Sequence, residues 1–82
     1  MANFFVISRD TIGKNADGLY SKFIKREYLR ISKSGRYIWD EDPACSTELS
    51  CCESCDIYAN LTRYIRPDYI YNRIFRYSDG EE

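Results

Sequence analysis

The length, composition and charge of this chain exclude several classes of protein. Its 82 residues allow one domain, its net charge is −1, and it contains no histidine, the commonest general base in enzymes. The apolar run near its N-terminus is short and follows no basic segment, so we expect neither a secretory signal nor a membrane span. We therefore expect a cytoplasmic, non-catalytic domain over residues 1–82, with a frayed tail at 77–82.

Charged and aromatic residues are distributed unevenly along the sequence. Residues 1–36 carry eight lysines and arginines against three acids, whereas residues 37–60 carry six acids and no base. Eight tyrosines, four phenylalanines and one tryptophan supply much of the apolar surface. A domain of this size cannot bury all of these rings, so we expect some of them to lie on the surface.

The first 28 residues predict a strand, a loop and a helix. The apolar run at 3–8 is typical of a buried strand. Residues 9–18 contain two glycines, two aspartates and an asparagine, which favour a loop. In 19–28, apolar residues recur at helical spacing with basic residues between them, which indicates a helix. The apolar residues are Leu19, Tyr20, Phe23 and Ile24.

Residues 27–42 predict a β-hairpin. They alternate on both sides of Ser34-Gly35, which is typical of a two-residue turn. With Lys33 paired to Arg36, Ile31 faces Ile38 and shares a face with Leu29. The opposite face then carries Tyr28, Arg30, Tyr37 and Trp39, with Arg30 close enough to Trp39 for a cation–π contact.

A helix is predicted to begin after Ser50. Ser50 and Glu53 occupy the two positions of a capping box, in which a serine at the N-cap and a glutamate three residues later bond reciprocally to backbone N–H groups. Apolar residues then follow on one helical face. They are Ile57, Leu61, Tyr64 and Ile65.

The remaining segments complete the expected fold. Residues 42–49 favour a loop or short turn, and Pro67 ends the helix or starts the next element. The alternation of aromatic residues and isoleucine in 69–77 favours a last strand, and a helix is the alternative there. We therefore expect an α+β fold with three or four mostly antiparallel strands and one or two helices packed on one face.

Four cysteines lie within eleven positions, and two interpretations of them lead. If the helix begins at Cys51, then Cys55 shares a helical face with both Cys51 and Cys52, and Cys45 can fold back from the preceding loop. Three thiolates are then easily placed for one structural Zn²⁺, whereas the fourth is strained. The other interpretation treats the cysteines as small apolar residues of the core. The residues concerned are Cys45, Cys51, Cys52 and Cys55.

Other cysteine chemistries fit less well. Cys52 and Cys55 form a C-x-x-C motif at a helix N-terminus, where the helix dipole lowers a thiol pKa, and this makes a thiol redox protein the third functional hypothesis. However, the surrounding acids would raise that pKa, and no βαβ unit precedes the motif. An iron–sulfur cluster lacks a distant fourth cysteine, and reducing cytoplasm disfavours a disulfide.

The basic first half suggests nucleic acid as one partner. Its lysines and arginines alternate with aromatic residues, which is the composition that binds phosphates and stacks on bases. Domains that depend on phosphate contacts are usually basic, however, and this chain has a pI of about 5.4. A zinc-stabilised nucleic-acid-binding domain is therefore the alternative hypothesis rather than the first.

The first hypothesis is a small non-catalytic module that binds a protein, as an inhibitor or adaptor, or a second copy of itself. Such short chains are often encoded by viruses or mobile elements and act on host machinery. One expected contact surface is acidic, mimics phosphate charge and has an aromatic anchor beside it: Trp39, Asp40, Glu41, Asp42 and Glu48. The other combines tyrosine and arginine, the residue types enriched in interface hot spots: Tyr64, Arg66, Tyr69 and Arg73.

Overall fold

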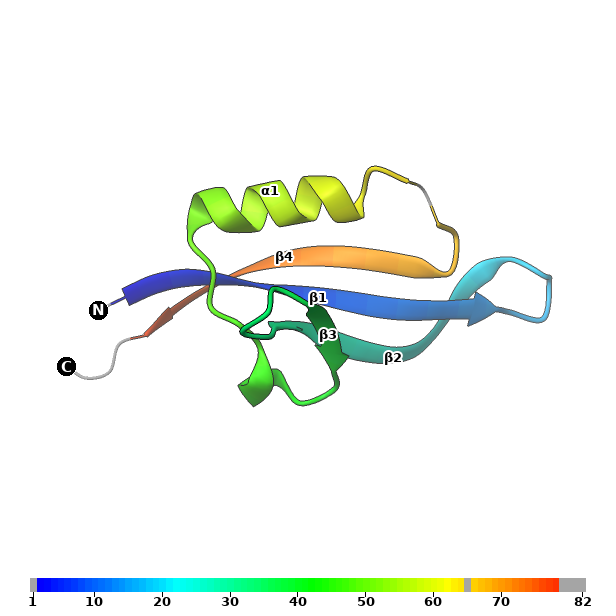
Figure 1. The fold of residues 1–82 in the computed structure, drawn as a ribbon. Coiled ribbons are helices and arrows are strands. Elements are labelled where there is room, and N and C mark those ends of the chain that lie inside the picture. The colour runs from blue at the N-terminus through cyan, green and yellow to red at the C-terminus, as the bar shows by residue number, and fades with distance from the viewer. Residues whose placement is uncertain (1, 65, 79–82) are drawn as a thin grey trace.

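The computed structural model describes residues 2–64 and 66–78 and contains a four-stranded antiparallel sheet and one α-helix (Figure 1). The sheet order is β3-β2-β1-β4, so β1 lies between the second strand and the last. This confirms the predicted small α+β fold. The elements are β1 (Ala2–Lys14), β2 (Tyr20–Ile31), β3 (Tyr37–Asp40), the 3-10 helix η1 (Pro43–Cys45), α1 (Cys51–Leu61) and β4 (Tyr69–Ser78).

One face of the sheet packs against α1 and holds the main core. Ile7 of β1 and Leu29 of β2 are buried there together with Leu49. Because side chains alternate across a strand, Val6 and Ser8 point to the other face, where they are also buried although α1 lies on the opposite side. Partly buried side chains complete the cluster on the α1 face: Ile31, Trp39, Ile57, Tyr58 and Leu61.

The predicted helix and final strand are both present. The Ser50 side chain accepts a hydrogen bond from the Glu53 N–H, and the Glu53 carboxylate accepts one from the Ser50 N–H, as the capping box requires. The helix ends at Leu61, well before Pro67, and Ile65 lies outside the described residues. β4 includes residues 77 and 78 of the expected tail, and 79–82 lie outside the described residues.

The loop predicted at 9–18 and the helix predicted at 19–28 are wrong. β1 continues to Lys14 and β2 begins at Tyr20, so a long antiparallel hairpin replaces both elements. Only a short turn around Gly18 remains of the predicted loop. Ile24 explains the misleading helical spacing, because it sits at a register shift between Lys25 and Phe23 and therefore interrupts the alternation of the strand.

The β2–β3 hairpin is confirmed, but its predicted register is wrong by one residue. The loop contains three residues rather than two, with Ser32 bonded to Arg36 across it and Gly35 at φ 85°. The shift reverses the faces of β3, since side chains alternate with a period of two. Trp39 therefore lies opposite Leu29 on the α1 face, and Arg30 lies opposite Ile38.

The β1–β2 hairpin is closed by a loop of the same kind. Asn15 bonds to Leu19 across it, and Gly18 occupies the left-handed position at φ 80°. The Asn15 side-chain oxygen also accepts hydrogen bonds from the N–H groups of Asp17 and Leu19. Both hairpins therefore use a three-residue loop that needs a glycine at its last position.

A short segment lies between β1 and β2 where these two strands separate. Their last pair at this end is Ser8 with Tyr28. Beyond it, the N–H of Thr47 donates to the carbonyl of Leu29, while Leu49 and Phe5 exchange two backbone hydrogen bonds. The chain thus reaches α1 by passing through the sheet between its two longest strands.

Candidate functional site

The outer half of the β1–β2 hairpin, residues 12–25, extends beyond the other two strands of the sheet, and we call it the arm. β4 pairs with β1 only up to Thr11, and β3 pairs with β2 only from Tyr28, so the arm is a two-stranded ribbon. Figure 1 shows it reaching past the ends of α1 and β4. No helix in the described part of the chain is long and apolar enough to cross a membrane.

Large apolar side chains are exposed along this arm. Seven consecutive residues of β2, from Tyr20 to Arg26, are exposed to solvent. Phe23 and Ile24 are 56% and 55% exposed, and Leu19 and Tyr20 beside them are exposed as well. Half of the exposed large hydrophobic side chains of the described residues therefore gather in one short stretch.

The arm presents apolar groups on both of its faces and is basic. Phe23 lies opposite Ile12 on the face away from α1, whereas Ile24 folds over Gly13, where a β-carbon would come within 2.8 Å of its terminal methyl. Lys14, which lies 5.6 Å from the Tyr20 ring, Lys22 and Lys25 add three positive charges. The described residues of the arm contain one acid, Asp17.

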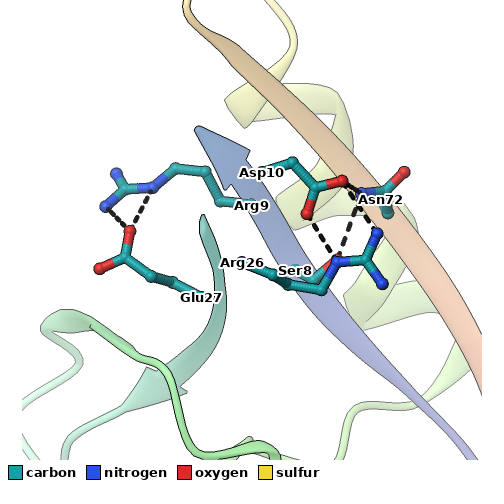
Figure 2. Close-up of polar contacts among 6 residues, drawn as sticks. All are labelled: Ser8, Arg9, Asp10, Arg26, Glu27 and Asn72. Carbon is teal, nitrogen blue, oxygen red and sulfur yellow. Dashed lines mark hydrogen bonds and ion pairs between the residues drawn. The ribbon is translucent and has the colours of Figure 1, made fainter. Parts of the chain in front are cut away.

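Two arginine–carboxylate pairs hold the base of the arm, one on each face of the sheet (Figure 2), and Lys25 also lies 3.6 Å from the Glu27 carboxylate. On the face away from α1, Arg26 donates two hydrogen bonds to Asp10 at 2.6 and 2.9 Å, and Asn72 connects Asp10 to Ser8. On the α1 face, Arg9 donates to Glu27 at 2.7 Å. In the first pair β1 supplies the carboxylate and β2 the arginine, and in the second pair these roles are reversed.

These contacts shift the pKa of both carboxyl groups. The hydrogen bonds from Arg26 hold the pKa of Asp10 below its usual range, against the opposing effect of burial. The hydrogen bonds from Arg9 lower the pKa of Glu27 in the same way. Both groups are therefore ionised at neutral pH and brace the arm where it leaves the rest of the sheet.

Trp39 does not stand beside the acidic residues as an exposed anchor. It is partly buried on the α1 face, and the Arg9 guanidinium lies 4.4 Å from its ring. The same guanidinium lies 4.6 Å from the ring of Tyr69, so Arg9 links β3 to β4. The predicted cation–π partner Arg30 is wrong, because the one-residue register shift puts it on the other face.

Three of the four residues predicted as a tyrosine–arginine surface come together in a shallow pocket. Tyr64, Arg66 and Tyr69 line it, and Tyr64 is 72% exposed. The pocket has a volume of about 240 Å³ and lies where the chain passes from α1 to β4. Its other lining residues are Tyr58, Thr62, Ile70 and Tyr71.

Arg73 lies apart from this pocket, at the N-terminus of α1. Its Nε donates to the Oγ of Ser54 at 2.8 Å, and its Nη2 donates to the Sγ of Cys51 at 3.1 Å. The guanidinium also lies 3.9 Å from the ring of Phe5. Ser54 is completely buried, so these contacts fix the start of the helix to β4 rather than offering Arg73 to a partner.

The predicted acidic residues lie at the end of β3 and in the segment that follows it, and two of them bond to backbone N–H groups there. Asp40 accepts a hydrogen bond from the N–H of Asp42, and Asp42 in turn accepts one from the N–H of Ala44 at the start of η1. Glu41 and Glu48 are exposed. Two of the four carboxylates therefore shape the loop.

The four cysteines are exposed and unpaired. In the part of the chain that the structure describes, which includes all four, no group of three or more Cys, Asp or Glu side chains is placed to hold a metal ion. Partial desolvation, followed by the carboxylates of Asp40 and Asp42, raises the pKa of the Cys45 thiol, which keeps it protonated at neutral pH. This arrangement does not fit the tetrahedral thiolate site expected for zinc.

No model of a known protein family, no curated protein and no solved structure matches this chain. Functional inference therefore rests on the surfaces described above. The apolar residues of the arm are visible in the sequence, but their exposure to solvent is not. An exposed two-stranded ribbon lacks the alternation that a buried face imposes.

Proposed function

We propose that this protein is a non-catalytic binding module and that the arm is the part that engages its partner, a protein. The observation that supports this most is the run of seven exposed residues in β2, from Tyr20 to Arg26. Exposed apolar clusters on small domains mark interaction sites, since they gain free energy only when a partner covers them.

The chemistry of the arm indicates the surface that it fits. Phe23, Ile24 and Tyr20 call for an apolar groove, and three lysines around them call for acidic residues at its rim. A ribbon of two strands is narrow enough to enter such a groove from its end. The Asp10–Arg26 and Arg9–Glu27 pairs support this role by fixing the direction in which the arm leaves the sheet.

Site-specific crosslinking tests this proposal. A photoreactive phenylalanine analogue replaces Tyr20 in the arm, and the same analogue at Ser34, in the β2–β3 turn, serves as the control. A protein captured only from the arm is then purified and titrated against the unmodified chain. We expect the double variant Phe23→Ser with Ile24→Ser to bind at least about tenfold more weakly, as the loss of an interface hot spot requires.

A matched variant separates loss of binding from loss of fold. Tyr37→Ser removes a comparably exposed ring from β3, outside the arm, and is expected to leave affinity unchanged. If the arm and β3 variants weaken binding equally, the arm is not the contact surface. If instead the chain is retained on heparin and binds it less well after Lys22→Glu, the partner is a nucleic acid and the proposal of a protein groove is wrong.

A further inference from the structure

The outer edge of the sheet offers a second surface, which is independent of the arm. β4 is an edge strand, and no other strand of the described chain pairs with its outer side. The carbonyl of Asp68 accepts from the N–H of Ile12, so the even-numbered residues of this strand direct their backbone groups toward β1. The backbone N–H and C=O groups of Tyr71 and Arg73 point to the open edge instead. Unpaired backbone groups at such an edge can bond to another strand.

We propose that the chain forms a symmetric dimer in which β4 pairs antiparallel with β4 of a second copy, with Asn72 opposite Asn72. A two-fold axis through this position joins the two sheets into one sheet of eight strands. Residues opposite each other then share a face, and Tyr71 and Arg73 of each copy exchange backbone hydrogen bonds with Arg73 and Tyr71 of the other.

The side chains of β4 are self-complementary in this register. Asp68 lies opposite Arg76 of the second copy, and neither forms an ion pair with any described residue of its own chain. Ile70, which is 51% exposed, lies opposite Ile74. No like-charged pair occurs between the described residues of the shared edge, since Arg73 lies opposite Tyr71 and Arg76 lies opposite Asp68. A shift of the register by two residues in one direction would place Arg73 opposite Arg73 of the second copy. A shift in the other direction would separate Asp68 from Arg76.

The α1 face favours the same arrangement. Tyr69 of the aromatic pocket lies opposite Phe75 of the second copy, and Phe75 is 54% exposed in the single chain. α1 packs on β1 and β4 and runs antiparallel to β4, with Cys51 near Arg73 and Tyr58 near Tyr71. The two helices therefore lie antiparallel about two strand spacings apart, roughly 10 Å, which is a normal packing distance for helices.

Sedimentation velocity over a wide concentration range tests the dimer and its register. We expect Arg76→Glu to weaken dimerisation about tenfold or more, because the variant brings two pairs of like charges together in each dimer. Adding Asp68→Lys to Arg76→Glu restores opposite charges and is expected to return the dissociation constant to within about threefold of the starting value. Lys33→Glu, in the β2–β3 turn, is the control and leaves it unchanged.

Disulfide crosslinking provides a second readout. The variant Asn72→Cys is made in a chain whose four native cysteines have been replaced by serine. It places two thiols beside the two-fold axis at a Cα separation of about 4.5 Å, within the range that a disulfide spans. We expect this variant to form a covalent dimer on mild oxidation and Ser34→Cys not to. A monomer at every concentration overturns the proposal, and so does a dimer that neither responds to the charge swap nor crosslinks at position 72.

Discussion

Arg26 and Asp10 form a two-point ion pair on the sheet face away from α1, with N–O distances of 2.6 and 2.9 Å. Asp10 is nearly buried, whereas the Arg26 side chain is half exposed and keeps part of its hydration. We therefore expect Asp10→Asn to lower the free energy of unfolding by about 1–2 kcal/mol, measured by urea denaturation. Asp17→Asn, in the exposed turn of the arm, is the control, and an equal effect of both changes would contradict this role of the pair.

The same two carboxyl groups predict a loss of stability in acid. The pKa values of Asp10 and Glu27 are lowered in the folded protein, so the unfolded chain binds protons more readily. Their contribution is present above the unfolded pKa values, about 4, and is lost as the pH falls through the lower folded values. Urea midpoints measured from neutral pH to pH about 3 should decline less steeply for Asp10→Asn with Glu27→Gln than for the original chain.

The two hairpin loops predict a specific response to substitution. Gly18 and Gly35 have φ values of 80° and 85°, and no atom lies within 4 Å of a β-carbon built on either. Changing either to alanine should therefore cost about 1–2 kcal/mol through backbone strain alone. Asparagine tolerates this conformation better, so Gly35→Asn should cost less than Gly35→Ala in thermal unfolding. Equal costs would show that the loop changes its conformation instead.

Removing the buried hydroxyl of Ser54 should lower the free energy of unfolding by more than the small size of this group suggests. Its Oγ accepts from Arg73 and donates to the Cys51 carbonyl at 2.9 Å. Ser54→Ala leaves the Arg73 Nε without that acceptor, and we expect a loss of about 1–3 kcal/mol in chemical denaturation. Cys55→Ala, on the exposed side of the same helix, should cost less than half as much, so similar losses would rule out this contact as the cause.

The exposed cysteines predict that all four thiols react in the folded protein. Titration with a thiol reagent at neutral pH, without denaturant, should count four groups. Because the pKa of Cys45 is raised, its alkylation should require a higher pH than that of a cysteine in an unstructured peptide. Protected thiols that appear only after a chelator is added would instead support the structural zinc site, and a native mass spectrum would then contain the metal.

The sequence predicted those elements whose signals are local. The capping box of Ser50 and Glu53 fixes the start of α1 through hydrogen bonds within four residues, and the alternation in β4 reflects two faces with different surroundings. Both could be recognised without knowing the fold. The hairpin of β2 and β3 was also recognised, but its register depends on whether the loop holds two or three residues. Gly35 is compatible with either.

The arm could not be predicted because its stabilising contacts are distant in sequence. Arg9 and Asp10 resemble loop residues until Glu27 and Arg26 are known to lie beside them. The helical spacing from Leu19 to Ile24 arises from a bulge in a ribbon that no layer covers. Tyr64, Arg66 and Tyr69 share one pocket and also lie close together in the sequence. The contact of Arg73 with Ser54, 19 residues away, gave no signal in the sequence.

The position of β1 in the interior of the sheet has a consequence for the kinetics of folding. Its pairs with β4 join residues near the two ends of the described chain, from Thr11 with Tyr69 to Ala2 with Ser78. Contacts of such sequence separation form late, since a long loop must close before they stabilise the chain. During synthesis, the β1–β2 hairpin therefore has an unpaired edge on β1 until β4 has been made. In this interval the nascent chain is most vulnerable to strand pairing with neighbouring chains.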